Sequence, residues 1–253
     1  MKRLEFAKEG NIGMIKFPSF SFVSNLLEIR DEFLELCLKI EMSEEIKVII
    51  ITAFERDEME DTKSLKEELS LFSHLPLERF RFSEGFSLID RPCICAIPNK
   101  VKGVGLEIVL ACDIRVAAEG AVFSFSHLKE GLIPWDGMTQ RLPRLVGMGR
   151  AFELLLTAKS IDASEARRIG LINRIVPKDS LMDETKKLAQ EMASKAPISL
   201  RFIREAIYKG LDLPLEHALR MEGDLYLLLF TTEDRSEGIK AFREKRKPIF
   251  KGE

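Results

Sequence analysis

The sequence predicts an α/β core that carries an α-helical segment at its C-terminal end. Strand patterns alternate with helical patterns as far as about residue 176, and a proline at 177 stops the last strand. Only helical patterns follow. Alternation of this kind is typical of α/β folds. The chain has 253 residues, 45% of them hydrophobic and 32% charged, so it has enough apolar side chains for a large core and is not a disordered protein.

The first 52 residues predict a hairpin, a helix and a buried strand. Residues 4–7 and 12–17 flank a turn-rich trio, which is typical of a hairpin. Asn25 and Glu28 have the spacing of a capping box at the start of a helix. Residues 46–52 contain a β-branched run, which is expected of a strand covered on both faces.

The middle of the chain predicts four more strands and two more helices. Residues 56–71 are heavily charged and predict a loop that leads into an amphipathic helix. Another helix is expected to start near Gly103. The predicted strands are 93–97, 114–117, 121–125 and 172–176.

Two later helices are predicted from residues that are typical of helix ends. Asp162 and Glu165 predict the cap of a helix that ends at Gly170. Pro197 suits the first turn of a helix that ends at Gly210.

Charge and cysteine content exclude several classes of protein. Lys and Arg number 39 against 41 Asp and Glu, so the net charge of −2 gives no general attraction to nucleic acid. The four cysteines are too few for a disulfide framework and lack zinc-site spacing, which favours a reducing cytoplasm and no metal. We expect no secretion signal, because residues 1–10 carry scattered charges and no apolar core. We also expect no membrane-spanning segment, because no apolar run approaches about 18 residues.

A glycine pair is the first candidate site. Gly103 and Gly105 flank Val104 between a predicted buried strand and a helix, where free main-chain amides can hold an anion. The alternative is a tight turn that needs glycine for its geometry alone. From these residues alone the two interpretations are about equally supported.

A longer run of motifs resembles the crotonase (enoyl-CoA hydratase/isomerase) superfamily. The resemblance begins at Arg91, includes the glycine pair and continues through 111–117. Phe123, Gly131 and Pro134 follow with the family's spacing, and then 137–147, GMTQRLPRLVG, is similar to the family's GGTQRLPRLVG. The match covers about 91–251 strongly, whereas residues 1–90 match mainly by pattern.

The resemblance implies a crotonase-like spiral of β-β-α units, with a core at 1–190 and a C-terminal helical segment at 191–253 for trimerisation. It also implies an acyl-CoA thioester substrate, with coenzyme A as part of the substrate and no permanently bound cofactor. In the family two main-chain N–H groups stabilise an enolate oxygen. By position they belong here to Val104 and Lys63, with Gly103, Gly105 and Leu65 beside them in the substrate site.

Two residues are implied to move protons. Glu107 stands in an apolar run, where a carboxylate is costly to bury without a purpose. Hydratases of the family carry a second glutamate twenty residues later, and this chain has His127. An imidazole can also exchange protons near neutral pH, so Glu107 is the base and His127 the acid, or the reverse. Alone, a histidine of this kind is more often structural.

Other candidates for substrate binding follow the histidine. Pro134, Trp135 and Asp136 lie near the acyl group by resemblance, with Asp136 as a reserve acid and Trp135 either as pocket lining or as ordinary packing. At the C-terminal end Lys245 belongs to a basic run that either is a solvated helix face or contacts CoA phosphates. The family often supplies this helix from a neighbouring subunit, which implies a homotrimer or a dimer of trimers.

The sequence thus predicts an acyl-CoA-processing enzyme of the hydratase/isomerase type. The alternative is a CoA-binding or assembly homologue with little activity, which is favoured by His127 and by acidic residues near the expected CoA path. RNA binding, known in a few relatives, gains little support from the net charge.

Overall fold

A computed structural model describes residues 4–17, 26–53 and 76–253. Its larger sheet has six strands in the order β1-β2-β3-β4-β6-β9. The first pair is antiparallel and the others are parallel. The strands are β1 (Glu5–Glu9), β2 (Ile12–Phe17), β3 (Val48–Ala53), β4 (Cys93–Ile97), β6 (Ile114–Ala118) and β9 (Arg174–Val176).

The predicted hairpin and buried strands are confirmed. Glu9 pairs with Ile12 across a turn in which Gly10 has a φ of 57°, a conformation that glycine adopts without strain. In β3, Ile49 and Ile51 contribute to one core and Val48 and Ile50 to the other. Because its side chains are buried on both faces, β3 carries apolar residues in succession.

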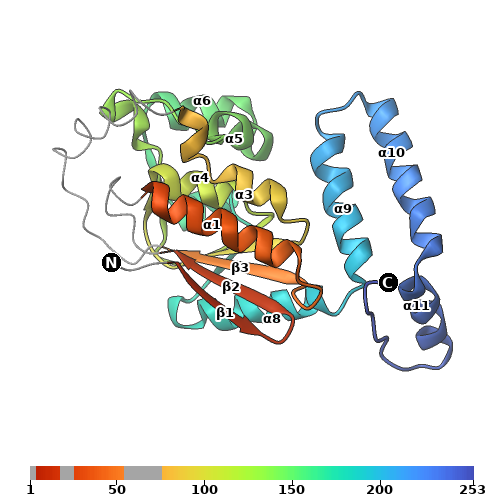
Figure 1. The fold of residues 1–253 in the computed structure, drawn as a ribbon. Helices are drawn as coiled ribbons and strands as arrows, with labels where there is room; N and C mark the ends of the chain where they lie inside the picture. Colours follow the sequence, from red (N-terminus) through yellow and green to blue (C-terminus); the bar gives the residue numbers. More distant parts are fainter. Residues whose placement is uncertain (1–3, 18–25, 54–75) are drawn as a thin grey trace.

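Helices cover both faces of this sheet (Figure 1). The first core joins one face to α1 (Leu26–Glu41), α3 (Ser83–Leu88) and α4 (Gly103–Ala111). The second core joins the opposite face to α8 (Leu181–Ala193). The sheet therefore lies between two helical layers, as the predicted α/β class requires. The predicted helix start at Asn25 and the predicted loop and helix over 56–71 lie outside the described residues.

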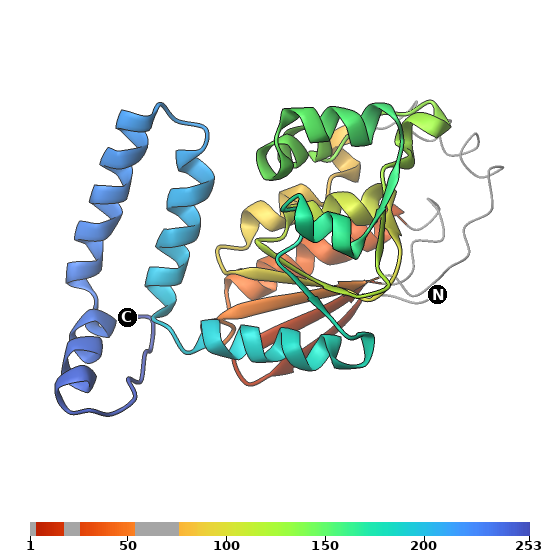
Figure 2. The same cartoon turned by 180° about the vertical axis from the view of Figure 1, so that it is seen from behind.

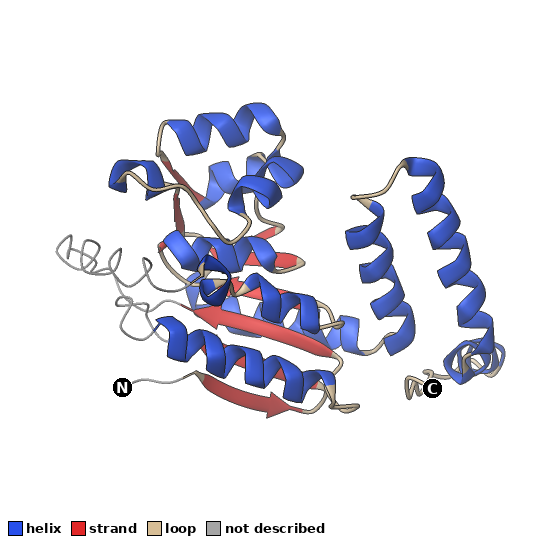
Figure 3. Cartoon of the chain, turned by 45° about the horizontal axis from the view of Figure 1, so that its top comes forward, coloured by secondary structure: helices blue, strands red, loops and turns tan. Residues whose placement is uncertain are grey.

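A smaller sheet of three strands, in the order β5-β7-β8, lies beside the first. Its strands are β5 (Val101–Lys102), β7 (Val122–Ser124) and β8 (Ser160–Asp162). α7 (Ala163–Arg168) packs on β7 and β8, whereas α5 (Met138–Val146) packs on α4 and on α6 (Met148–Leu156). In Figure 3 the strands, in red, lie among helices, in blue. From β4 to β9, strands of the larger sheet are interleaved along the chain with the short strands of the smaller one and with helices, as the predicted crotonase-like spiral requires. Asp162 caps α7 by accepting a hydrogen bond from Glu165 N, as predicted.

Short 3₁₀ helices complete the described chain, at η2 (Leu77–Phe80), η3 (Ser126–Glu130), η4 (Lys178–Ser180) and η5 (Leu229–Thr231).

The last three α-helices form an arm that stands to one side of the sheets (Figures 1 and 2). They are α9 (Pro197–Gly210), α10 (Leu215–Leu228) and α11 (Glu233–Arg243). The division predicted after residue 190 falls in the last turn of α8, which packs on the larger sheet. The first helix of the arm, α9, begins at Pro197.

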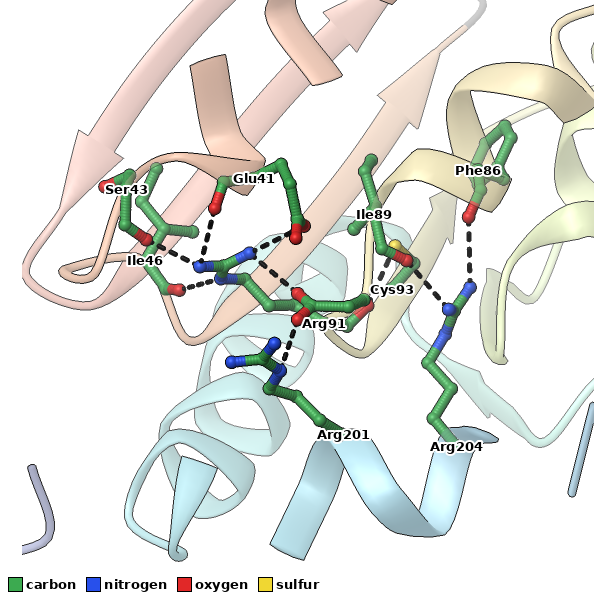
Figure 4. A network of polar contacts seen from close by, with 10 residues as sticks. Glu41, Ser43, Ile46, Phe86, Ile89, Arg91, Cys93, Arg201 and Arg204 are labelled. Carbon is green, nitrogen blue, oxygen red and sulfur yellow. Dashed lines mark hydrogen bonds and ion pairs between the residues drawn. The ribbon is translucent and has the colours of Figure 1, made fainter. Parts of the chain in front are cut away.

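Arginines attach α9 to the core (Figure 4). Arg204 Nη1 donates to the carbonyl oxygen of Ile89 at 2.7 Å, and its Nε lies 3.1 Å from the Asp113 carboxylate. Arg201 pairs with Asp90. On the sheet side, Arg91 is buried and its guanidinium is satisfied by main-chain carbonyls and carboxylates from 41–46 and Asp90. These charge-assisted bonds fix the direction in which the arm leaves the core.

Candidate active site

The predicted glycine pair forms the first turn of α4. Gly103 has a φ of 54°, and a Cβ at this position would meet no atom within 4 Å. The glycine is therefore required by the backbone conformation and not by a close contact. Because the first amides of a helix have no partner within the helix, the N–H of Val104 is available to an anion. Both interpretations of the glycine pair, a tight turn and an anion site, are compatible with this geometry.

Glu107 lies one turn further along α4. Residues three apart lie on the same face of a helix, so Val104 and Glu107 share a face. The helix is apolar almost throughout, and Glu107 is only 1% exposed. Its Oε2 accepts hydrogen bonds from the main-chain N–H groups of Asp136, at 2.6 Å, and Met138, at 3.3 Å. Since Met138 is the first residue of α5, the carboxylate lies at the positive end of that helix.

His127 faces the other oxygen of this carboxylate. It comes from η3, is 5% exposed, and its Nε2 lies 3.5 Å from Glu107 Oε1. Glu107 Oε1 and both imidazole nitrogens form no hydrogen bond within the described residues. The ring of Trp135 meets the imidazole edge to face, with ring centroids 6.4 Å apart. Unsatisfied buried polar atoms are costly, so their concentration here indicates a place for a bound polar group.

Asp136 contributes to the site through its main chain. Its side chain is 2% exposed, and its carboxylate accepts hydrogen bonds from Phe82 N at 2.7 Å and from Ser83 N at 3.1 and 3.2 Å. Burial raises the pKa of Asp136, although the Ser83 hydroxyl and these two amides act in the opposite direction. The carboxylate is thus engaged at the start of α3, while the N–H of the same residue donates to Glu107 Oε2.

The structure brings together most of the residues that the sequence singles out. Gly103, Val104, Gly105 and Glu107 share α4, and His127, Trp135 and Asp136 meet them from the segment after β7. Pro134 is half-buried at the start of the turn that leads into α5. Lys63 and Leu65 lie outside the described residues.

Lys245 is separated from these residues. It lies two residues after the end of α11, on the arm that stands away from α4 (Figure 1). Arg246 of the same basic run is engaged within the arm, where it pairs with Glu237 and Glu244. Lys245 is therefore not part of the same chain's cluster around Glu107.

Four contributors to the site do not emerge from the sequence. Met138 supplies an amide to Glu107, and Arg141 donates to the Asp136 carbonyl oxygen at 2.7 Å. Phe82 and Ser83 hold the Asp136 carboxylate. Met138 and Phe82 act through main-chain N–H groups, which any residue except proline carries. Arg141 belongs to the 137–147 motif, which is the signal that could have drawn attention to it.

No group of three or more His, Cys, Asp or Glu side chains within 4–17, 26–53 and 76–253 is arranged to hold a metal ion. Over the same ranges, none of the helices is long and apolar enough to cross a membrane.

Comparison with known proteins agrees with this architecture. Residues 8–253 match the family model described as enoyl-CoA hydratase/isomerase. A putative enoyl-CoA hydratase/isomerase of Bacillus subtilis is 36% identical over 85% of this chain and 84% of its own length. A crotonyl-CoA hydratase of Syntrophomonas wolfei is 40% identical over 71% of this chain and 68% of its own.

A solved structure gives the same result. The crystal structure of an enoyl-CoA hydratase from Bacillus anthracis superposes with a TM-score of 0.84 at 31% identity and covers the whole of both chains. The chain therefore belongs to the enoyl-CoA hydratase/isomerase family.

Proposed function

We propose that this protein is a lyase or isomerase that acts on acyl-CoA thioesters, with Glu107 and His127 as the groups that move protons. The proposal rests on the different environments of the two oxygens of the Glu107 carboxylate. Oε2 is held by two main-chain amides, whereas Oε1 is directed at His127 and forms no hydrogen bond with the described residues. One oxygen is thus fixed and the other is free to exchange a proton.

The proposed substrate position follows from α4. The N–H of Val104 holds the thioester oxygen, and Glu107 lies on the same helical face beside the acyl carbons. We assign the second oxyanion N–H to Lys63, with Gly103, Gly105 and Leu65 as its surroundings. Preorganised amides of this kind stabilise the negative charge that develops on the oxygen when an enolate forms.

The proton steps balance with these two groups alone. In hydration, one of the pair removes a proton from water as its oxygen bonds to C3, and the other delivers a proton to C2 as the enolate collapses. In isomerisation, one group removes a proton from the acyl chain and one returns a proton at another carbon. Either assignment of base and acid to Glu107 and His127 satisfies this balance.

A trimer, or a dimer of trimers, is the proposed assembly. The arm exposes many large apolar side chains. Large exposed apolar surfaces of this kind mark sites of contact with other proteins. Those at least half exposed are Ile203, Ile207, Leu211, Leu215, Leu219, Tyr226, Leu227, Leu228, Phe242 and Ile249. In the proposed assembly the arm reaches a neighbouring subunit, where Lys245 contacts the CoA phosphates. We place the assembly in the cytoplasm.

Calorimetric titration with acetyl-CoA and with free CoA tests this proposal. We expect acetyl-CoA to bind with a dissociation constant in the micromolar range and more tightly than CoA, because only the thioester has the carbonyl oxygen that Val104 would hold. The same preparation is then assayed for turnover of crotonyl-CoA and of 3-enoyl and dienoyl thioesters. Absence of binding to either ligand would contradict the acyl-CoA function.

A CoA-binding or assembly subunit with little catalysis is the second candidate. It is favoured by His127, which replaces the second glutamate of the hydratases. This candidate predicts binding of acetyl-CoA in the titration without turnover of any thioester in the panel.

A further inference from the structure

Asp136 is fixed by three different groups. Its carboxylate caps the start of α3 through the amides of Phe82 and Ser83, and its carbonyl oxygen accepts a hydrogen bond from Arg141. Its own N–H donates to Glu107 Oε2 at 2.6 Å. The side chain and the main chain of one residue thus connect α3, α5 and the Glu107 carboxylate.

The turn that follows depends on the same contacts. Gly137 has a φ of 102°, and a Cβ there would collide with the Arg141 guanidinium. Met138 N, the second donor to Glu107 Oε2, comes directly after this glycine. Both amides that hold Glu107 therefore belong to a turn whose position is set by Asp136 and Arg141.

We propose that Asp136 is a positioning residue that fixes Glu107 through its main-chain N–H, and that its carboxyl group transfers no proton. The inference deepens the proposed function, because it concerns the group that we assign to proton transfer. Both carboxylate oxygens of Asp136 are occupied by amides at the start of α3. Neither oxygen is bonded to Glu107 or to His127, so the Asp136 carboxyl group has no direct path for a proton to the pair that we assign to proton transfer.

Loss of the Asp136 side chain would free the turn and rotate Glu107. Displacement of a catalytic group by about 1 Å can cost about 10²-fold in rate. Asparagine can retain an oxygen at the Oδ2 position, where both amides of α3 converge, whereas alanine retains none. Asp136→Asn and Asp136→Ala therefore separate positioning, which needs only an acceptor, from proton transfer, which needs an acid.

The test uses the intact chain and reads His127 directly. Ring nitrogen-15 signals of labelled histidine are recorded for the wild type, Asp136→Ala and Asp136→Asn, with His127→Gln to assign the signal. Steady-state kinetics on crotonyl-CoA are measured on the same samples. Asp234→Asn is the matched control, because Asp234 is 3% exposed and accepts two main-chain amides, from Lys251 and Gly252 on the distant arm.

We expect Asp136→Ala to shift the His127 ring signals and to lower kcat by about 10- to 100-fold with KM within about threefold. Asp136→Asn should keep the signals and a kcat within about fivefold of the wild type, and Asp234→Asn should change neither. Equal loss of kcat in the alanine and asparagine variants would overturn the proposal, since it would indicate proton transfer. Unchanged ring signals in Asp136→Ala would also overturn it.

Two further outcomes remain decisive. Absence of turnover by the wild type would contradict the proposed function, and the ring signals would then decide the positioning role alone. If Asp136→Ala does not fold, Arg141→Met provides the same comparison, because it removes only the bond to the Asp136 carbonyl oxygen. It should shift the His127 signals in the same direction, and unshifted signals would overturn the proposal.

Discussion

His127 Nε2 lies 3.5 Å from Oε1 of Glu107, while Oε2 of the same carboxylate accepts two main-chain amides. The pair is almost fully enclosed, with exposures of 5% and 1%. A carboxylate next to an imidazole differs from the carboxylate pair of the hydratases, because the two groups attract each other when both are charged. In the function that we propose, this pairing takes the place of the two carboxylates that the resemblance to hydratases implies.

The first prediction concerns the identity of the second proton-transfer group. His127→Glu should hydrate crotonyl-CoA about 10²-fold faster than His127→Gln, because glutamate can exchange a proton and glutamine cannot. Initial rates of loss of enoyl absorbance, measured for both variants and the wild type, provide the comparison. If the glutamate variant were no faster than the glutamine variant, His127 would not limit hydration. The limit would then lie in the second oxyanion position, which we assign to Lys63.

The predicted strand 93–97 and the predicted cap at Asp162 were both found as expected. The strand is an apolar run between Pro92 and Pro98, and the cap is a local contact between Asp162 and Glu165. Both signals involve neighbours in the sequence, which is why sequence alone is sufficient for them.

The environment of Glu107 could be predicted only in part. Resemblance to the family singled out Glu107 and His127, but the amides that hold Glu107 come from residues 29 and 31 positions away. The resemblance suggests Asp136 as a reserve acid, but its carboxylate faces α3, a short helix that the sequence does not predict. Of the smaller sheet, only β7 is predicted, within 121–125, because β5 and β8 have two and three residues and are too short for a periodic pattern.

Substitutions at the contact between α9 and the core should lower the stability of the protein. Asp113 accepts hydrogen bonds from Arg204 Nε and Tyr208 OH, the latter at 2.8 Å. Arg204→Met should lower the free energy of unfolding by about 3 kcal/mol, because it leaves a largely buried carboxylate without its cation. Tyr208→Phe, which removes a single hydrogen bond to a charged group, should cost about 1.5 kcal/mol. Denaturant unfolding measures both, and equal losses would contradict this ranking.

The burial of the cysteines predicts that their thiols are unreactive in the folded protein. All four cysteines are buried and free, and burial raises the pKa of Cys37 to about 12 and also raises those of Cys93 and Cys112. A thiol reacts as its thiolate, so the folded protein should not react with a colorimetric disulfide reagent near neutral pH. Denatured protein should titrate four thiols, and Ser194→Cys should add one reactive thiol in the folded state. Rapid reaction of the native wild type would contradict this burial.

Acid sensitivity of the arm should depend on Glu237. Its hydrogen bonds from Arg246, and then from Ile249 N, lower its pKa from 4.5 to about 2. The stabilisation from this depressed pKa is present above about pH 4.5 and is lost as the pH falls toward 2. The difference in unfolding free energy between the wild type and Glu237→Gln should therefore shrink over this interval. Because the pair is exposed, added salt should also reduce the difference, and a difference independent of pH would contradict the assignment.

Replacement of Glu107 by glutamine tests the central claim most directly. Glutamine keeps an oxygen for the amides of Asp136 and Met138 but cannot exchange a proton. For Glu107→Gln we predict that kcat for crotonyl-CoA falls by about 10²- to 10⁴-fold, while acetyl-CoA binds with a dissociation constant within about threefold of the wild type. A variant that turns over crotonyl-CoA as fast as the wild type would contradict the role of Glu107 in proton transfer.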